Sequence, residues 1–449
     1  MTDKGNEITL VLGLARSGLA ALRLLGREGV KVRAADENQD ISLPEDLAGI
    51  DLRKGKLDIS VLDGVSRMVI SPGVPVDHPI VRGARETGVR VISELELAYN
   101  YVSAPVIAVT GTNGKSTTVS MIGAILEEAG KDVIVAGNVG IPFSSVAGDL
   151  GPEGYYVIEV SSFQLEAVDR FRPVCAGILN LTPDHHDRYG NLDDYYDTKK
   201  RIYANCRKED RFFYNHDDSR CRSAAEEFPG TIIPFSSVGR IDRGVFLDGD
   251  SLVRILSDGS EEKVMERNDL GVVGLHNVEN ALSAIAAVEC LGISAEACRR
   301  ALSSFRGLRH RMEKIAEIRG VSFFNDSKAT NVEAAVKSLI GLDRPVVLIA
   351  GGYNKGDDFS GLLEIVQKVR AVVTLGKAAS LIEDVLAGKV ETYRSASMED
   401  AVGKAAGIAE EGDMVILSPA CASFDMFDDF EHRGDVFAEC VNDLKRSKD

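Results

Sequence analysis

The eight residues from Thr110 to Thr117 read TGTNGKST and lie between an apolar, strand-like run and a helical pattern. Glycines in such a turn let backbone N–H groups converge on phosphate oxygens, and the helix start and Lys115 add positive charge. Val109 stands where the usual GxxxxGK[ST] loop has its first glycine, and a plain turn with an exposed lysine is the alternative. The GK[ST] triplet at the helix start favours a site for nucleotide phosphates and Mg²⁺. The candidate ligands are Gly111, Asn113, Gly114, Lys115, Ser116 and Thr117.

Acidic and imidazole side chains follow two further strand-like runs. Glu159 lies near the end of YYVIEVS, where an isolated carboxylate is costly unless it is paired or bound. His185 lies in TPDHHDRY after the next apolar run, and we take its neighbour His186 as a bystander. A carboxylate, a lone imidazole and the Ser116 hydroxyl fit a Mg²⁺ shell. Alone, either Glu159 or His185 is more often structural.

Two amides and three charged residues lie further along the chain. Asn277 and Asn280 are three residues apart in HNVEN and share a helical face, where they either cap a loop or contact a nucleotide. Arg311, Asp326 and Lys328 lie near an expected strand end, where ligands bind in open α/β sheets. A surface ion pair of little energetic weight is the alternative for these charges.

The N-terminal turn, GLARSG at residues 13–18, resembles a dinucleotide fingerprint, with Asp36 at the end of the next expected strand. Ala15 replaces the middle glycine, which normally lets the backbone approach a pyrophosphate closely. We therefore expect a single nucleotide here rather than a complete NAD site.

Strand-like and helical patterns alternate along most of the chain. A βαβ unit opens it at residues 7–36, a second α/β unit begins at 104–110, and residues 244–260 predict a hairpin or meander. The βα alternation restarts near Gly307. We predict the α/β class with three domains, at residues 1–102, 103–306 and 307–449.

Composition narrows the functional classes. Hydrophobic residues make up 44% and charged residues 27%, and no apolar run approaches the roughly 20 residues that span a bilayer. The N-terminus has no signal-peptide pattern, so we expect a cytoplasmic protein. The formal net charge of −17 argues against nucleic acid as a partner. Seven cysteines without a CxxC pair argue against a disulfide framework or a zinc ribbon.

These motifs, in this order, resemble the Mur ligases over essentially the whole chain. The set that carries the resemblance is TGTNGKST, EVSSFQLE, NLTPDHHDRY, YDTKK, HNVEN, LRHRME, NDSKATN and GGYNKGDDF. The segment LSPACASFDMFDDFEHRG at 417–434 is similar to that of the members that add D-glutamate. The resemblance implies a Rossmann-like UDP-binding domain, a central P-loop-type ATPase domain and a Rossmann-like C-terminal domain that brings the amino acid.

The resemblance also implies roles for single residues. Lys115, with Ser116 and Thr117, would hold the ATP phosphates, and Glu159 and His185 would serve magnesium, with two ions expected. Lys199 in YDTKK matches the lysine that is carbamylated in the family and supports the second metal; Lys200 lies beside it. The nucleotide contacts implied are Asn277, Asn280, Arg311, Asp326 and Lys328. The catalytic residues implied are Lys115, His185 and Lys199.

Substrate contacts are implied near both ends of the chain. The UDP-linked substrate would be contacted by Ser17, Asp36, Ser71, Gly73 and, near the reacting end, Asn138. The D-glutamate pocket would comprise Thr330, Lys355, Ser423, Phe424 and Phe430. Glu37 and Asn38 follow Asp36 where the family often has a cation, so recognition of uracil and diphosphate departs from the family pattern here.

The implied activity is ATP-dependent addition of D-glutamate to UDP-N-acetylmuramoyl-L-alanine through an acyl phosphate, in the cytoplasmic stage of peptidoglycan synthesis. We expect a monomer. The alternatives within the family are ligases that add L-alanine, ligases that add a diamino acid, and ligases that add glutamate to folate. A nicotinamide oxidoreductase would explain the N-terminal βαβ unit but not TGTNGKST. A nucleotide-dependent switch without ligase activity would not need the complete set of predicted metal ligands.

Overall fold

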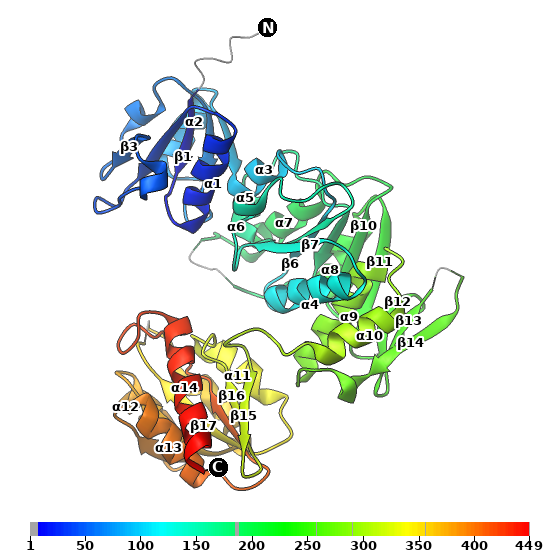
Figure 1. Cartoon of the computed structure of the whole chain (residues 1–449), viewed down its shortest axis with the longest axis vertical. Helices are drawn as coiled ribbons and strands as arrows, with labels where there is room; N and C mark the ends of the chain where they lie inside the picture. The colour runs from blue at the N-terminus through cyan, green and yellow to red at the C-terminus, as the bar shows by residue number, and fades with distance from the viewer. Residues whose placement is uncertain (1–7, 185–187, 257, 290, 355, 449) are drawn as a thin grey trace. The chain divides into compact units, whose positions relative to one another are not determined.

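The computed structural model describes residues 8–184, 188–256, 258–289, 291–354 and 356–448. The chain forms two compact units, Met1–Leu270 with Asn277–Ser304 and Gly271–His276 with Phe305–Asp449. The first unit carries two sheets and the second carries one, each with helices packed against it (Figure 1). The predicted α/β class is confirmed. Within the described residues no helix is long and apolar enough to cross a membrane.

The N-terminal sheet has the order β3-β2-β1-β4-β5, and every neighbouring pair is parallel. Its strands are β1 (Ile8–Leu12), β2 (Val32–Asp36), β3 (Asp51–Lys54), β4 (Val65–Ile70) and β5 (Arg90–Ser93). The helical segments are α1 (Arg16–Arg27), η1 (Glu45–Leu47), η2 (Ile59–Leu62), α2 (Pro79–Glu86) and α3 (Glu94–Tyr99). Residues Ala21, Leu22 and Leu25 form the buried stripe of α1, which packs this helix on the sheet.

The central sheet has the order β14-β13-β12-β11-β10-β9-β6-β8-β7 and is parallel from β12 to β7. Its strands are β6 (Val106–Thr110), β7 (Val133–Gly137), β8 (Tyr155–Glu159), β9 (Cys175–Ile178), β10 (Arg211–Asn215), β11 (Thr231–Ser236), β12 (Gly244–Asp248), β13 (Ser251–Ile255) and β14 (Glu261–Glu266). Its helical segments are α4 (Lys115–Glu128), α5 (Phe143–Val146), α6 (Ser162–Leu165), α7 (Leu192–Lys200), η3 (Arg201–Tyr203), α8 (Ser219–Glu226), η4 (Arg267–Asp269), α9 (Leu275–Glu289) and α10 (Ala295–Ser304).

Strand β6 lies between β8 and β9, and this order positions the candidate site. Val109 pairs with Glu159 on β8, and Thr110 pairs with Ile178 on β9. Because the three strands are parallel, the segments that follow them emerge at one edge of the sheet. The loop at 111–114, Glu159 and the segment after β9 are therefore neighbours.

The sheet of the second unit has the order β15-β16-β20-β17-β18-β19, with β15 antiparallel to β16 and the other pairs parallel. Its strands are β15 (Glu313–Ile318), β16 (Val321–Asn325), β17 (Val346–Gly351), β18 (Val369–Leu375), β19 (Glu391–Arg394) and β20 (Met414–Leu417). Its helical segments are α11 (Val332–Ile340), η5 (Phe359–Lys368), α12 (Ala379–Leu386), α13 (Met398–Ile408) and α14 (Phe430–Lys448).

Alternate residues of β17 pack on opposite faces of this sheet. Val346 and Leu348 belong to a core cluster with α11, η5 and α12. Val347 and Ile349 belong to another cluster with α13 and α14. A parallel strand buried on both faces reads as a continuous apolar run, which is why PVVLIAGG was recognisable as a strand.

Some elements differ from the sequence expectation. The predicted hairpin is confirmed as β12 and β13, whose strands pair antiparallel. The helical pattern after β17 forms the 3₁₀ segment η5 rather than an α-helix, and Gly361 near its start weakens α-helical propensity. The strands β10, β11, β14 and β15 were not predicted, and neither were the short strands β3 and β19. Both short strands lie at sheet edges and are mostly exposed, so they lack the apolar run that marks a buried strand.

Candidate active site

The loop at 111–114 joins β6 to α4 and requires glycine at two positions. Gly114 caps α4 in the left-handed region, with φ of 84°, and Gly111 has φ of 149°. A Cβ atom on Gly114 would lie 2.4 Å from Asn280 Oδ1, so a side chain does not fit. The backbone is thereby held around the N-terminus of α4, where unpaired N–H groups favour phosphate oxygens.

Lys115 folds back over this loop. Its Nζ donates to the carbonyl oxygens of Gly111 at 3.0 Å and Thr112 at 2.9 Å. Ser116 is buried at the first turn of α4, and Thr117 is half-buried beside it. The loop therefore combines one lysine charge, hydroxyl groups and helix-terminal N–H groups within a few residues.

Asn180 holds the loop from the segment that follows β9, and it was not predicted as a site residue. Its Oδ1 accepts from the backbone N–H groups of Thr112 at 3.0 Å and Asn113 at 2.8 Å, and its Nδ2 donates to the Asn113 carbonyl at 3.2 Å. The signal in the sequence is its place in NL, directly before TPDHHDRY. One amide thus fixes three backbone groups of the loop.

Lys199 reaches the same loop from α7. It is 2% exposed, its Nζ donates to Gly111 O at 2.9 Å, and it lies 4.7 Å from the ring centre of Tyr195. Burial first, and then the charge of Lys115, lower the pKa of Lys199 well below 10.5, while Asp184 and Glu159 act in the opposite direction. Lys200 behaves differently, because hydrogen bonds and ion pairs with Glu227 and Asp197 raise its pKa.

Glu159 ends β8 and is 2% exposed. Its Oε1 accepts a hydrogen bond of 3.0 Å from Asn138 Nδ2. Its Oε2 is buried and accepts no hydrogen bond from the described residues. A buried carboxylate oxygen without a donor is costly, which is the environment expected for a cation ligand.

The predicted amide pair lies behind the loop. Asn277 and Asn280 are each 7% exposed, and Asn280 Nδ2 donates to Asn277 Oδ1 at 3.3 Å. Thr118 of α4 donates to Asn280 Oδ1 at 3.4 Å. The start of α9 is therefore packed against the loop and the first turns of α4.

The residues predicted to bind the UDP-linked substrate line one cavity of about 500 Å³ in the first unit. These residues are Ser17, Asp36, Ser71, Gly73 and Asn138. Asp36 accepts hydrogen bonds from the N–H groups of Leu14 at 2.6 Å and Asn38 at 2.8 Å. Arg16, Glu37 and His78, which were not predicted, also line the cavity.

The remaining predicted residues lie in the second unit. Asp326 is 4% exposed and accepts from Ser418 Oγ at 2.9 Å; burial raises its pKa to about 6. Lys328 Nζ lies 3.7 Å from the ring centre of Phe430, a cation–π contact. Ser423 is buried, and Phe424 is 65% exposed. Thr330 and Arg311 are half-buried.

Arg433 connects the two segments that carry these residues and was not predicted. It is 1% exposed, and burial lowers its pKa to about 10. Its guanidinium donates to Ser327 Oγ and Ser327 O, each at 2.9 Å, and to Cys421 O at 3.0 Å. Arg433 thereby ties NDSKATN, which carries Lys328, to SPACASFD, which carries Ser423.

Two predicted residues, His185 and Lys355, lie outside the described residues. Among the described residues, no group of three or more His, Cys, Asp or Glu is arranged to hold a metal ion. The six cysteines within the described part of the chain are free thiols.

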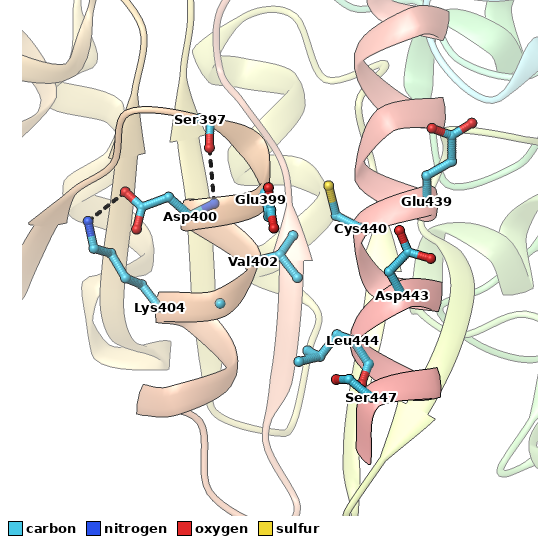
Figure 2. A pocket seen from close by; sticks show the side chains of 11 residues that line it. Ser397, Glu399, Asp400, Val402, Lys404, Glu439, Cys440, Asp443, Leu444 and Ser447 are labelled. Atoms are coloured by element: carbon cyan, nitrogen blue, oxygen red, sulfur yellow. Dashed lines mark hydrogen bonds and ion pairs between the residues drawn. The ribbon is translucent and has the colours of Figure 1, made fainter. Parts of the chain in front are cut away.

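A different cavity, of about 940 Å³, opens between α13 and α14 (Figure 2). Its lining includes Glu399 and Asp400 of α13 and Glu439 and Asp443 of α14. None of the predicted site residues lines it, and its carboxylates would repel a nucleotide. We therefore do not assign the nucleotide or the substrates to this cavity.

Sequence profiles of three domains match successive parts of the chain. The Mur ligase MurD-like N-terminal domain matches residues 7–93, the Mur ligase middle domain matches 109–288, and the Mur ligase glutamate ligase domain matches 310–421. The chain belongs to the Mur ligase family.

Within that family, two relatives named UDP-N-acetylmuramoylalanine--D-glutamate ligase match almost end to end. The protein from Pelotomaculum thermopropionicum is 42% identical over 457 residues, which cover 99% of this chain and 100% of the relative. The protein from a Thermoanaerobacter species is 39% identical over 456 residues, with the same shares covered.

Solved structures of the family share the fold. MurF ligase from Thermotoga maritima in complex with ADP has a TM-score of 0.60 at 15% identity, covering 99% of this chain and 100% of that one. UDP-N-acetylmuramate-alanine ligase MurC from the same organism has a TM-score of 0.59 at 21% identity, covering 98% and 100%.

Proposed function

We propose that this protein is an ATP-dependent ligase that joins D-glutamate to the alanyl carboxylate of UDP-N-acetylmuramoyl-L-alanine. The observation that carries the proposal is the meeting of the 111–114 loop, Lys199 and Glu159 at one edge of the central sheet. The relatives named above, similar over nearly their whole lengths, support the choice of substrates.

The proposed binding roles of the three predicted domains follow their order in the chain. Residues 1–102 would bind the UDP-linked substrate, residues 103–306 would bind ATP, and residues 307–449 would bring the amino acid. The cavity lined by Ser17 and Asp36 supports the first assignment, and the loop before α4 supports the second. The proposed ATP contacts belong to both units, with Asn277 and Asn280 in the first and Arg311, Asp326 and Lys328 in the second.

Chemistry explains the need for ATP. A carboxylate is a poor electrophile, because an amine attacking it would have to expel oxide. In the proposed reaction a carboxylate oxygen of the alanyl group attacks the γ-phosphorus, and the bond between that phosphorus and the β–γ bridging oxygen breaks to release ADP. The D-glutamate amine then attacks the acyl carbon and loses a proton, and phosphate leaves with the former carboxylate oxygen. The protein's contribution is positioning and charge neutralisation.

Lys115 is the residue proposed to neutralise the transferred phosphate. Its Nζ now donates to the Gly111 and Thr112 carbonyls, which are neutral acceptors. Phosphate oxygens are charged and form stronger hydrogen bonds with an ammonium group. The lysine is therefore held within the loop, ready to exchange its carbonyl partners for phosphate oxygens.

The residues present fit a divalent cation. Glu159 offers the buried Oε2 that lacks a donor, and Ser116 offers a hydroxyl at the start of α4. Both are hard oxygen ligands of the kind that Mg²⁺ prefers. Bound Mg²⁺ would neutralise phosphate charge and polarise the γ-phosphate. His185 remains a proposed ligand from the sequence.

Lys199, rather than Lys200, is the proposed site of carbamylation. An amine must be neutral to add CO₂ and form a carbamate, and the lowered pKa of Lys199 favours the neutral form. The ion pairs of Lys200 stabilise its charged form instead. A carbamate on Lys199 would add a negative oxygen ligand near Glu159 and support a second magnesium ion.

D-Glutamate carries two carboxylates and needs cations and hydroxyls. Thr330 and Ser423 lie on the two segments that Arg433 joins, and they are the proposed hydroxyl ligands within the described residues. Lys355, Phe424 and Phe430 complete the proposal from the sequence. The reaction would take place in the cytoplasm, where ATP is available, and we propose a monomer because each proposed role falls on this one chain.

The experiment that tests the function is an amino-acid panel followed by phosphate release. Purified protein with ATP, Mg²⁺ and UDP-N-acetylmuramoyl-L-alanine is expected to release phosphate with D-glutamate and to form the corresponding amide. L-Glutamate, L-alanine and a diamino acid are the competing donors, and UDP-N-acetylmuramate and folate are the competing acceptors. Turnover with any competing pair that exceeds turnover with D-glutamate would contradict the assignment.

A further inference from the structure

The cavity that we assign to the UDP-linked substrate has an unequal distribution of charge. Asp36 and Glu37 contribute two carboxylates, and Arg16 is the one arginine or lysine among its described lining residues. A nucleoside diphosphate group adds further negative charge, and the whole chain already carries a formal net charge of −17. Such a ligand needs a local cation to offset the repulsion.

Arg16 lies at a helix N-terminus, a position that suits the binding of an anion. It is the first residue of α1 and is exposed. The N-cap residue, Ala15, makes no side-chain capping hydrogen bond to the helix. Open N–H groups at the start of a 12-residue helix and a guanidinium group together suit phosphate oxygens.

The contacts of Arg16 show which end of the cavity is cationic. Its Nη2 donates to the carbonyl oxygen of Gly140, in the segment that follows β7. The same segment carries Asn138, which donates to Glu159 on β8. The cationic end of the cavity therefore faces the central sheet and its candidate metal ligand.

The acidic part of the lining follows β2 of the N-terminal sheet. Asp36 ends β2 and accepts from the Leu14 and Asn38 N–H groups. Glu37 lies 3.2 Å from His78 Nε2. The two carboxylates suit the N–H and O–H donors of a nucleoside, and their negative charge disfavours a diphosphate.

We propose that Arg16 binds the diphosphate and so orients the substrate, with its nucleoside toward Asp36 and its sugar toward Asn138. The inference rests on the proposed function and adds a specificity-determining residue to it. On binding, the guanidinium exchanges the neutral Gly140 carbonyl for charged oxygens. Charge-assisted hydrogen bonds are roughly twice as strong as neutral ones, so the exchange favours the bound state.

The test compares UDP with uridine by isothermal titration, because the two ligands differ by the diphosphate alone. Arg16→Ala is expected to weaken UDP binding by about ten- to a hundredfold, the range for a lost hydrogen bond to a charged group, and to leave uridine affinity unchanged. Arg16→Lys keeps the charge and should fall between the two. In steady-state kinetics Arg16→Ala should raise KM for UDP-N-acetylmuramoyl-L-alanine far more than it lowers kcat.

Arg27→Ala is the matched control, because Arg27 lies on the same helix and also contacts the central part of the unit. Its Nη2 donates to Ser144 O at 3.4 Å, and Nη1 lies 4.0 Å from Asp149. It does not line the cavity. Arg27→Ala should bind UDP like the wild type.

The possible results of these titrations distinguish the role of Arg16 from the proposed ligase activity. If Arg16→Ala bound UDP as tightly as the wild type, or lost UDP and uridine equally, the role of Arg16 would be overturned and the ligase activity would stand. If the wild type bound neither UDP nor the complete substrate, both proposals would fail.

Discussion

Lys199 Nζ donates a hydrogen bond of 2.9 Å to the carbonyl oxygen of Gly111. A buried lysine on α7 is thereby joined to the loop that we propose holds the ATP phosphates. Lys115 donates to the same carbonyl at 3.0 Å, so two lysines converge on one backbone oxygen. This convergence explains why the charge of Lys115 helps to lower the pKa of Lys199.

Replacing Lys199 by methionine is expected to abolish turnover and, in protein prepared without bicarbonate, to raise the free energy of unfolding. The pKa of Lys199 lies well below 10.5 in the folded state, so between that pKa and 10.5 the unfolded chain binds the extra proton. Wild-type stability therefore rises with pH through this window. The stability difference between the variant and the wild type should shrink as the pH rises from about 7 toward 10.5, as measured by denaturant unfolding.

Lys200→Met is the control for that experiment, because Lys200 is ion-paired with Glu227 and Asp197. It should retain turnover and show no comparable change of stability with pH. Equal loss of turnover in both variants, or loss in Lys200→Met alone, would contradict the assignment of the carbamylated residue.

Replacing Lys115 by alanine is expected to lower kcat by about a hundredfold or more, because the ammonium group offsets charge on the transferred phosphate. Binding of UDP-N-acetylmuramoyl-L-alanine should be unchanged, since the proposed cavity for that substrate does not include Lys115. Phosphate release and titration calorimetry measure the two effects. Full turnover in the variant would refute the role of Lys115.

Replacing Glu159 by glutamine is expected to raise the Mg²⁺ concentration needed for half-maximal turnover by about tenfold or more. The amide oxygen keeps the acceptor for Asn138 Nδ2, so the local hydrogen bond survives while the negative charge is lost. The thermal midpoint without Mg²⁺ should not fall, because the buried Oε2 has no described donor to lose. An unchanged Mg²⁺ requirement would argue against Glu159 as a ligand.

Asn180→Ala removes three hydrogen bonds from the backbone of the loop and should weaken ATP binding by about tenfold or more. Asn205→Ala is the control, because Asn205 also donates to two backbone carbonyls, of Asp169 and Phe171, away from the loop. Fluorescent nucleotide titration measures the affinity. Comparable weakening by the two variants would show a general loss of stability instead.

Asp326→Asn tests the cost of a buried carboxylate. The folded-state pKa is about 6 against an ordinary 3.8, so the folded state holds the proton more tightly and wild-type stability falls as the pH rises through about 6. A shift of about two units corresponds to roughly 3 kcal/mol. The variant should therefore gain stability over the wild type between about pH 4 and 8 in denaturant titrations, while ATP turnover falls. A stability difference that did not change with pH would contradict the shifted pKa.

Sequence motifs were most informative where a function depends on residues that are close together in the chain. TGTNGKST predicted a glycine-lined loop at a helix start, and the structure has Gly114 as the cap of α4 with Lys115 at its first position. The apolar runs of the buried strands predicted the α/β class, because each run is a stretch of consecutive residues. Both signals depend on residues that are close in sequence.

Contacts between distant residues could not be predicted in this way. Asn180 lies 67 positions from Asn113, and Arg433 lies 106 positions from Ser327, yet each amide or guanidinium organises a proposed binding segment. The choice between Lys199 and Lys200 likewise depends on which face of α7 is buried. The domain boundaries and the individual ligand roles remain predictions.

We propose that ATP activates the alanyl carboxylate as an acyl phosphate. The most direct measurement uses UDP-N-acetylmuramoyl-L-alanine labelled with ¹⁸O in that carboxylate, together with ATP, Mg²⁺ and D-glutamate, and follows the released phosphate by mass spectrometry. Each released phosphate is expected to carry one labelled oxygen and to form in step with the new amide. Amide formation with unlabelled phosphate, or ATP hydrolysis without an amide, would contradict this proposal.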